Sequence, residues 1–238
     1  MSGKVDKLVM IITGTSRGIG EYLARHYLES DYIVIGCSRT DGEIEHPDYH
    51  HFKVDIASEH QVLDVIKYAR KEFKRISVLI NNAAINPAIL SAALLPYETI
   101  QNAYKVNVFA PMLFCRESIK IMARKKFGRI INIGSMASKH EVPGEALYTS
   151  TKSAMIAYTR VVAKEVYNLG ITVNVIAPSA IANTELFNQI DSKALFEVLS
   201  RNAIHTTGDF KDISNIIDLL LKKESHAITG QVIYLGGA

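Results

Sequence analysis

Cysteine is scarce in this chain. The 238 residues include only two, Cys37 and Cys115, and both stand in apolar stretches. No CxxC pair or Cys/His array has the spacing of a zinc site, so we expect buried thiols in a reducing compartment and no metal site. His46, His50 and His51 cluster in a polar segment, where histidines are more often solvated than metal-bound, and we expect all three to be solvated.

An excess of one charge and a long hydrophobic run are also missing. The 27 basic and 24 acidic residues leave a net charge of +3, too balanced for the basic stripe of a nucleic-acid-binding protein. The longest uncharged stretch, residues 76–97, contains Asn81, Asn82, Asn86 and Pro87, which a lipid-spanning helix avoids. The N-terminus has one short apolar run followed by turn residues, which predicts a first strand rather than a signal peptide. We therefore expect a soluble, cytoplasmic protein.

The chain does contain a regular alternation of strand-length apolar runs and helical patterns. The apolar runs stand at residues 8–12, 33–37, 78–80, 130–133, 172–176 and 232–235, with a weaker one at 51–55. Helical patterns fall between them at residues 19–29, 59–73, 98–125, 147–167 and 212–222. The runs are nearly continuous in Val, Ile and Leu, as in parallel strands that are covered on both faces. This predicts an α/β fold, a Rossmann-type doubly wound parallel sheet of about seven strands with helices on both faces.

A glycine-rich loop follows the first predicted strand. Residues 13–20 read Thr-Gly-Thr-Ser-Arg-Gly-Ile-Gly and lead directly into a helical pattern. In such a loop Gly14 permits a tight turn, Gly18 lets the backbone approach a pyrophosphate, and Gly20 lets the helix pack on the strand. The helix N-terminus adds free N–H groups and a partial positive charge. With a strand before it and a helix after it, the loop predicts a dinucleotide site rather than a plain turn.

The residues after the second predicted strand indicate which dinucleotide binds. About 20 residues past the glycines, a chain that binds NAD(H) usually carries an acidic residue for the ribose hydroxyls. This chain has Ser38 there with Arg39 beside it, and Arg17 of the glycine-rich loop lies near the same ribose. Two guanidinium groups and a hydroxyl suit a phosphate dianion, so we expect NADP(H) in preference to NAD(H).

A tyrosine and a lysine stand four residues apart at the start of a predicted helix. Tyr148 and Lys152 therefore share one face. We expect the ammonium, together with an oxidised nicotinamide, to lower the pKa of the phenol from its usual value near 10, which makes Tyr148 a general acid and base. Ser135 follows the strand expected at residues 130–133, and its hydroxyl is placed to donate to a substrate oxygen. The tyrosine–lysine pair alone is a weak signal, and its weight comes from the combination with the loop and with Ser135.

These motifs resemble those of the short-chain dehydrogenase/reductase family, and the resemblance spans essentially the whole chain. The motif TGxxxGxG is residues 13–20, an Asn-Asn-Ala element is residues 81–83, and YxxxK joins Tyr148 to Lys152, with Ser135 and Asn107 at the active-site Ser and Asn positions. The resemblance implies an NAD(P)-dependent enzyme that reduces a carbonyl or oxidises an alcohol, with Ser135, Tyr148, Lys152 and Asn107 as catalytic residues. It also implies that Asn107 holds a water that contacts Lys152 and relays protons to solvent.

The same resemblance implies the residues that line the cofactor. They are Gly14, Ser16, Arg17, Gly18, Ile19, Gly20, Ser38, Arg39, Asp55, Ile56, Asn82, Ala83, Ala84, Ile133, Tyr148, Lys152, Pro178, Ser179, Ile181, Asn183 and Thr184.

Three departures from the family pattern fall within this set. Ala84 stands where glycine is usual, and Asn183 with Thr184 stands where a threonine is common. Ser179 replaces the glycine after Pro178, which puts a Cβ and a hydroxyl where backbone usually approaches the nicotinamide.

The substrate region is less specific. We expect one dinucleotide-binding and catalytic domain over residues 1–238, since no linker or repeat interrupts the chain, and a substrate lid at residues 179–210, where periodicity is weak after a strand end. Residues 85–95 and 136–147 are expected as the other walls, and their composition fits a substrate with an apolar portion.

The nearest overall pattern among relatives is that of 3-oxoacyl carrier-protein reductases. A basic cluster at residues 124–126 could meet an acidic carrier protein, although a solvated helix C-terminus explains it equally well. Leu169 stands where a second docking arginine is often found. Three alternatives therefore stay open: a reductase of secondary metabolism or sugar modification, an NAD(P)-linked alcohol dehydrogenase, and a binding protein with this fold but without turnover.

The helical patterns at residues 98–125 and 147–167 carry more apolar residues than one sheet contact explains. Relatives pair these two helices across a dimer axis, so we expect a homo-oligomer, with a tetramer favoured over a dimer.

Overall fold

Seven parallel strands form one sheet at the centre of the computed structural model, which describes residues 7–87, 89–182, 184, 187 and 192–237. The strands are β1 (Val9–Thr13), β2 (Ile33–Ser38), β3 (Tyr49–Lys53), β4 (Val78–Asn81), β5 (Gly128–Ile133), β6 (Ile171–Pro178) and β7 (Val232–Leu235). They lie in the order β3-β2-β1-β4-β5-β6-β7, and every neighbouring pair is parallel. The predicted fold class is confirmed.

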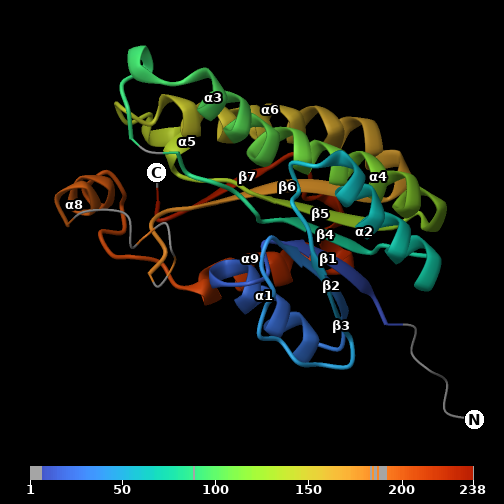
Figure 1. Cartoon of the computed structure of the whole chain (residues 1–238). Coiled ribbons are helices and arrows are strands. Elements are labelled where there is room, and N and C mark those ends of the chain that lie inside the picture. The colour runs from blue at the N-terminus through green and yellow to red at the C-terminus, as the bar shows by residue number, and fades with distance from the viewer. Residues whose placement is uncertain (1–6, 88, 183, 185–186, 188–191, 238) are drawn as a thin grey trace, which may run out of the picture.

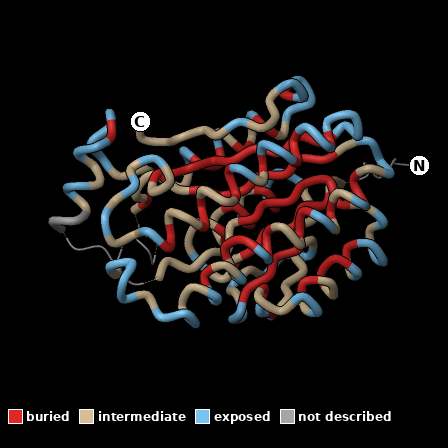
Figure 2. The backbone as a smooth tube through the Cα atoms, turned by 90° about the horizontal axis from the view of Figure 1, so that it is seen from above, coloured by how far each residue is buried: buried red, intermediate tan, exposed pale blue. Residues whose placement is uncertain are grey.

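Helices cover both faces of this sheet (Figure 1). Helices α2 (Glu59–Glu72), α4 (Ala110–Lys125) and α6 (Ala146–Val166) pack on one face, and α1 (Gly18–Glu29) and α9 (Phe210–Leu221) pack on the other. Buried residues run along the central strands between these two layers (Figure 2). Strands β1, β4, β5 and β6 are buried at every position, and this two-sided burial explains why their apolar residues do not simply alternate with polar ones.

Two elements differ from the sequence-based expectation. The single helix expected over residues 98–125 is α3 (Tyr97–Tyr104), a π-helical turn η2 (Lys105–Phe109) and then α4. An apolar period near 3.6 does not reveal a π turn, which inserts one extra residue and is frequent at functional sites. Strand β3 begins at Tyr49, two residues before the expected run, because it takes its register from β2, with Gly36 opposite His51.

The polar histidine cluster is also different from our expectation. His46 is exposed, but His50 and His51 are partly buried, so the expectation of solvated rings is wrong for these two. His50 Nδ1 lies 3.0 Å from the hydroxyl of Tyr68, and His51 Nδ1 lies 2.8 Å from that of Tyr49. Both cysteines are free and buried, as expected.

The segment expected to be a lid, residues 179–210, leaves the end of β6 and returns to α9. It contains α8 (Ser192–Ser200), and a bridge pairs Ile181 with Gly208 at its base. The backbone carbonyls of Gly236 and Gly237 accept hydrogen bonds from Ile204 and Ala203, which ties the end of this segment to the chain after β7. The described part of the chain has no helix long and apolar enough to cross a membrane.

The strand order places the site. From β1 the chain winds to β2 and β3 on one side, and from β4 it winds to β5, β6 and β7 on the other. In sheets of this kind ligands bind beyond the carboxyl ends of the strands, at the point where the winding reverses. That point lies between β1 and β4, next to the glycine-rich loop.

Candidate active site

The glycine-rich loop has the backbone geometry that a phosphate site needs. Gly14 and Gly18 adopt φ angles of +78° and +58°, which side-chain-bearing residues rarely take. A Cβ at Gly18 would meet nothing within 4 Å, so the backbone there is open to a ligand, whereas a Cβ at Gly20 would collide with the carbonyl group of Gly14. Gly18 therefore leaves room for a ligand above the loop, and Gly20 lets α1 pack against the turn.

A cavity of about 380 Å³ opens above this loop at the carboxyl ends of the strands. Its wall includes nearly all the predicted cofactor residues and three of the predicted catalytic ones: Gly14, Ser16, Arg17, Gly18, Ile19, Ser38, Arg39, Asp55, Ile56, Asn82, Ala83, Ala84, Ile133, Ser135, Tyr148, Lys152, Pro178, Ser179, Ile181 and Thr184. Gly20 and Asn107 do not line the cavity. Asn183 lies outside the described residues.

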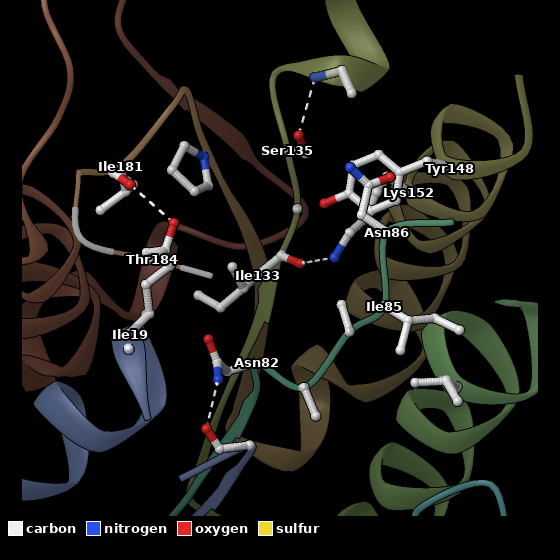
Figure 3. A pocket seen from close by; sticks show the side chains of 18 of the residues that line it. Ile19, Asn82, Ile85, Asn86, Ile133, Ser135, Tyr148, Lys152, Ile181 and Thr184 are labelled. Carbon is white, nitrogen blue, oxygen red and sulfur yellow. Dashed lines mark hydrogen bonds between the residues drawn. The ribbon is translucent and has the colours of Figure 1, made fainter. Parts of the chain in front are cut away.

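Strands β1 and β4 are joined at the cavity floor by Asn82 and Thr13. The Asn82 side chain donates to the Thr13 carbonyl at 2.9 Å, and the Thr13 hydroxyl accepts from the backbone N–H of Asn82 at 3.0 Å and of Ala83 at 2.9 Å. Asn82 thus fixes the spacing of the two strands at the point of reversal (Figure 3). Asn82, which belongs to the Asn-Asn-Ala element, therefore joins two strands as well as lining the cavity.

The carboxyl end of β2 presents a basic rather than an acidic surface. Arg39 is exposed on the cavity wall, and Arg17 lines the same wall from the glycine-rich loop. Ser38 is buried, and its hydroxyl donates to the carbonyl of Thr40 at 2.6 Å. The Ser38 hydroxyl therefore holds the loop after β2, which differs from the donor role that the sequence suggested. The carboxylate of Asp55, also on the wall, accepts from the N–H of Ala57 at 3.0 Å.

Ser135, Tyr148 and Lys152 meet at the other end of the cavity (Figure 3). The Ser135 hydroxyl oxygen accepts from the Ala137 N–H at 3.1 Å, and its side chain is hydrogen-bonded to that of Tyr148. Lys152 Nζ donates to the carbonyl of Ile133 at 2.9 Å and lies 5.6 Å from the centre of the Tyr148 ring. A serine hydroxyl and a phenol are thus presented side by side, with a cation one helical turn behind them.

The pKa values of this group do not follow the expectation drawn from the motif. Burial raises the pKa of Tyr148 to about 12, and the hydrogen bond from Ser135 opposes that rise. Burial lowers the pKa of Lys152 to about 8. The expected acidification of the phenol by its lysine neighbour is therefore wrong for the protein alone, because removing both groups from water disfavours phenolate and ammonium alike.

Asn107 lies behind the cavity wall in the π turn η2. Its side-chain amide donates to the carbonyl of Ile85 at 2.8 Å and to the hydroxyl of Thr151 at 3.1 Å, and its oxygen accepts from the Ile85 N–H at 2.9 Å. The side chain joins the segment after β4 to α6 next to Lys152. Its hydrogen bonds are made with the protein, and none of those found among the described residues reaches Lys152.

Ser179, the departure beside the predicted nicotinamide position, has a partner of its own. Its hydroxyl oxygen accepts from the side chain of Asn202 at 2.7 Å, and Asn202 is buried. Thr184 donates to the carbonyl of Ile181 at 2.9 Å and so shapes the turn after it. The hydroxyl introduced at position 179 is thus accommodated by a residue at the far end of the same segment.

Several residues of the cavity wall were not predicted from the sequence. Asn102 and Val106 line the cavity from α3 and η2, and their spacing of four residues, which puts side chains on one helical face, was an available signal. Thr40 also lines the cavity, and no sequence pattern indicated it. Within the expected wall at residues 136–147, Glu145 and His140 face the cavity, and burial raises the pKa of Glu145 and lowers that of His140.

Comparison with known proteins gives one consistent answer. Residues 8–195 match the sequence profile of the short chain dehydrogenase family. The chain is 31% identical to the 3-oxoacyl-(acyl-carrier-protein) reductase FabG of Rickettsia bellii, with 95% of this chain and 94% of that protein covered. It is 28% identical to FabG of Buchnera aphidicola, with 98% of each chain covered.

Solved structures agree with these sequence matches. The structure of ElxO with NADP bound superposes with a TM-score of 0.88 at 28% identity, covering 96% of this chain and 97% of that one. The structure of 4-hydroxyisoleucine dehydrogenase complexed with NADH gives a TM-score of 0.86 at 26% identity, covering 97% and 98%. The chain therefore belongs to the short-chain dehydrogenase family and is an NAD(P)-dependent oxidoreductase that acts on carbonyl or hydroxyl groups.

Proposed function

We propose that this protein is an NADPH-dependent reductase that converts a carbonyl to a secondary alcohol, with Tyr148 as the proton donor. The observation that carries the proposal is the meeting of Ser135, Tyr148 and Lys152 in the cavity whose opposite end is the glycine-rich loop. One ligand can therefore extend from the loop to the phenol.

The residues present fit a nicotinamide dinucleotide. The open backbone at Gly18 and the N-terminus of α1 suit a pyrophosphate, which gains from free N–H groups and the helix dipole. Lys152 and Ile133 lie at the far end of the cavity, where the nicotinamide riboside would rest. A bound cofactor supplies the hydride.

The proton chemistry falls to the side chains. With a pKa of about 12, Tyr148 keeps its proton through neutral pH and can donate it to an oxygen that gains negative charge. Ser135, whose oxygen is held by the Ala137 N–H, can turn its hydroxyl hydrogen from Tyr148 to the same oxygen when substrate is bound. Lys152 supports proton donation as the nearby cation, and Asn107 acts as a positioning residue through Ile85 and Thr151.

The preference for NADPH rests on the basic end of β2. Arg39 and Arg17 line the wall where a 2′-phosphate would lie, and guanidinium groups bind phosphate in a two-pronged geometry. One solved relative has NADP bound and another is complexed with NADH, so membership of the family does not decide between the two cofactors. The preference of this protein therefore depends on its local residues.

Replacing Arg39 with Ala tests this preference. The change is expected to weaken NADPH binding by roughly tenfold, because a charge-assisted bond to the phosphate is lost, and to leave NADH binding unchanged. Fluorescence titration of both cofactors measures it. Arg25→Ala, at a surface arginine of α1 that is ion-paired with Glu21, is the control. Wild-type protein that binds NADH as tightly as NADPH contradicts the NADPH preference.

For the substrate, we propose a ketone with an apolar portion, and a 3-oxoacyl thioester as the first candidate. The relatives named as 3-oxoacyl-(acyl-carrier-protein) reductases support that candidate. The segment 179–210, which contributes Ile181, Phe187 and Val198 to the wall, is proposed as the lid over it. Other ketones and keto-sugars are the alternatives.

A substrate panel read by NADPH absorbance separates these choices. The panel holds 3-oxoacyl thioesters, simple ketones and keto-sugars. Oxidation of NADPH with the thioesters is expected. Turnover confined to the keto-sugars would replace the substrate proposal, and no turnover with any member would favour a binding protein with this fold.

A homo-oligomer, with a tetramer favoured, is part of the proposal. Phe109, the last residue of η2, and Val161, on α6, are 58% and 56% exposed in the single chain, which is unusual for large apolar side chains on paired helices. Changing both to Asp is expected to shift the mass measured by light scattering from tetramer to smaller species. Phe196→Asp, at an exposed aromatic of α8, is the control and should leave the mass unchanged.

A further inference from the structure

The segment that follows β4 is fastened to the beginning of α6 at two points. At the first, the side chain of Asn107 joins the backbone of Ile85 to the hydroxyl of Thr151. At the second, the N–H of Leu90 donates to the carbonyl of Gly144 at 3.1 Å, two residues before the helix begins. Residues 86 and 87 follow the first point directly, so they lie beside the first turns of α6, where the proposed proton donor stands.

Asn86 brings an unpaired amide into the cavity at this place. Its side chain is half-buried and lines the cavity, in the part that also holds Tyr148 and Lys152 (Figure 3). No hydrogen bond joins this amide to another residue in the described part of the chain. Polar groups that are removed from water normally have a partner, and an amide offers both donors and an acceptor. The Asn86 amide is therefore available to a ligand.

Glu145 brings a carboxyl group to the same part of the cavity. It directly precedes α6, three residues before Tyr148, and it lines the wall. Burial raises the pKa of Glu145, and the charge of Arg201 opposes that rise. The pKa of Tyr148, raised mainly by burial, is raised further by the charge of Glu145, which places the carboxyl near the phenol. Among the residues that the structure describes, the carboxyl forms no hydrogen bond or ion pair.

The segment 179–210 gives the cavity a different kind of surface. It contributes the apolar side chains of Ile181, Phe187 and Val198. The wall thus combines an apolar surface with two polar groups, Asn86 and Glu145, that have no partner in the described protein. A wholly apolar substrate that displaced water from both would leave each without a hydrogen bond, which is costly for a desolvated polar group.

We propose that Asn86 and Glu145 together bind a neutral hydrogen-bonding group of the substrate, a hydroxyl or an amide, near the reacting carbonyl. This inference rests on the proposed reductase function and narrows its substrate class to an amphipathic ketone. The hydroxyl or amide hydrogen is donated to the Glu145 carboxyl, and the oxygen of the same group accepts from the Asn86 amide. The apolar portion of the substrate faces the segment 179–210.

Both kinds of group occur in the substrates already proposed. A keto-sugar carries hydroxyls next to its carbonyl, and the arm that holds a 3-oxoacyl thioester on a carrier protein contains amides. The chemistry required of the protein is the same in the two cases. Two pairs of small ketones therefore separate the sources.

The test measures selectivity within each matched pair. The first pair is 1-hydroxy-2-octanone and 2-octanone, which differ by one hydroxyl. The second pair is the N-acetylcysteamine thioester and the S-pentyl thioester of 3-oxobutanoate, which differ by one amide. The ratio of kcat/KM within each pair is measured with NADPH for wild type, Asn86→Ala and Glu145→Ala. Dividing the wild-type ratio by that of a variant removes the difference in chemical reactivity between the two ketones, which is the same for every protein.

Wild type is expected to prefer the polar member of at least one pair, and that pair identifies the group that binds. Asn86→Ala and Glu145→Ala should each lower this preference by about tenfold, since each removes one hydrogen bond to the group. Glu145→Gln keeps an acceptor oxygen and should retain more of the preference than Glu145→Ala. An unchanged preference in Asn86→Ala and in Glu145→Ala overturns the inference.

Ser91→Ala is the matched control for Asn86→Ala. Ser91 is the other polar residue of the segment 85–95, but it is exposed and lies outside the cavity wall. This variant should keep the wild-type ratio for both pairs. If Asn86→Ala and Glu145→Ala instead lower kcat/KM equally for both members of each pair, the two residues act on the site as a whole, and the inference is wrong.

A second measurement needs neither turnover nor a variant. Nitrogen NMR of asparagine-labelled wild type follows the side-chain amide of Asn86 while ligands are added. The signals should move with 1,2-octanediol or with the N-acetylcysteamine thioester, and much less with 2-octanol or the S-pentyl thioester. Equal effects within both pairs would overturn the inference. If the signals distinguish the paired compounds while wild type oxidises NADPH with none of the four ketones, the reductase function fails and the binding site remains.

Discussion

Replacing Tyr148 with Phe is expected to lower kcat by about a thousandfold and to leave NADPH affinity unchanged. The variant removes a proton donor whose contribution is commonly between a hundredfold and ten thousandfold. The ring stays, so the packing of a side chain that is 8% exposed is kept. Steady-state turnover of the best substrate in the panel and fluorescence titration of NADPH measure the two effects separately.

Tyr104→Phe is the matched control for this prediction. The Tyr104 hydroxyl donates to Ser150 at 3.3 Å, on the same helix as Tyr148, but Tyr104 does not line the cavity. This control should retain turnover within about twofold. A Tyr148→Phe protein with a kcat within tenfold of wild type would show that the proton comes from elsewhere.

The raised pKa of Tyr148 bears on the direction of the reaction. A phenol with a pKa of about 12 is protonated at neutral pH and suits carbonyl reduction, in which it gives its proton away. Alcohol oxidation needs phenolate, which in this buried site requires added positive charge. The cations near the phenol, Lys152 and an oxidised nicotinamide, are thus needed more for oxidation than for reduction.

The fold was predictable because its strongest determinants are local. Continuous apolar strands, a strand–loop–helix passage at Gly14 and helices of two to six turns follow from composition and period, and all seven strands were expected within a few residues. One general rule, that ligands bind at the carboxyl ends of parallel strands, predicted Ser135 at the cofactor crevice, and the resemblance to the family implied that Tyr148 shares its site.

The features that escaped prediction depend on contacts distant in sequence. The π turn at Asn107 is stabilised by hydrogen bonds to Ile85 and Thr151, which no local pattern announces. The contacts of His51, with Tyr49, which is bonded to Thr15 of the glycine-rich loop, and with the carbonyl of Thr40 after β2, likewise join distant parts of the chain. The pKa of Tyr148 was misjudged because the motif shows which cation is near but not how deeply both groups are buried.

Burial of Lys152 leads to a second prediction with a large effect. This side chain, proposed to act in catalysis, lowers the free energy of unfolding of the protein. An unfolded lysine titrates near 10.4, and burial lowers the pKa of Lys152 to about 8. Between these values the unfolded chain binds more protons than the folded one, so wild-type stability rises with pH across that window. Below pH 8 the full cost of keeping a buried ammonium, about 3 kcal/mol, is present.

Lys152→Met is therefore expected to be more stable than wild type at pH 7 and to lose at least a hundredfold in turnover. Removing the ammonium gains about 3 kcal/mol and gives up one hydrogen bond to Ile133, worth about 1 kcal/mol, so the free energy of unfolding should rise by about 2 kcal/mol. Urea unfolding at pH 7 and at pH 10 measures the change.

The pH dependence identifies its cause. As pH rises from 8 toward 10.4 the wild type recovers the lost stability, so the advantage of Lys152→Met should disappear by about pH 10. Lys164→Met, at an exposed lysine of the same helix, should stay within about 0.5 kcal/mol of wild type at both pH values. A Lys152→Met protein less stable than wild type at pH 7 would mean that the ammonium is stabilised in place by its surroundings. The prediction that Lys152 lowers the stability of the fold while it serves catalysis would then be wrong.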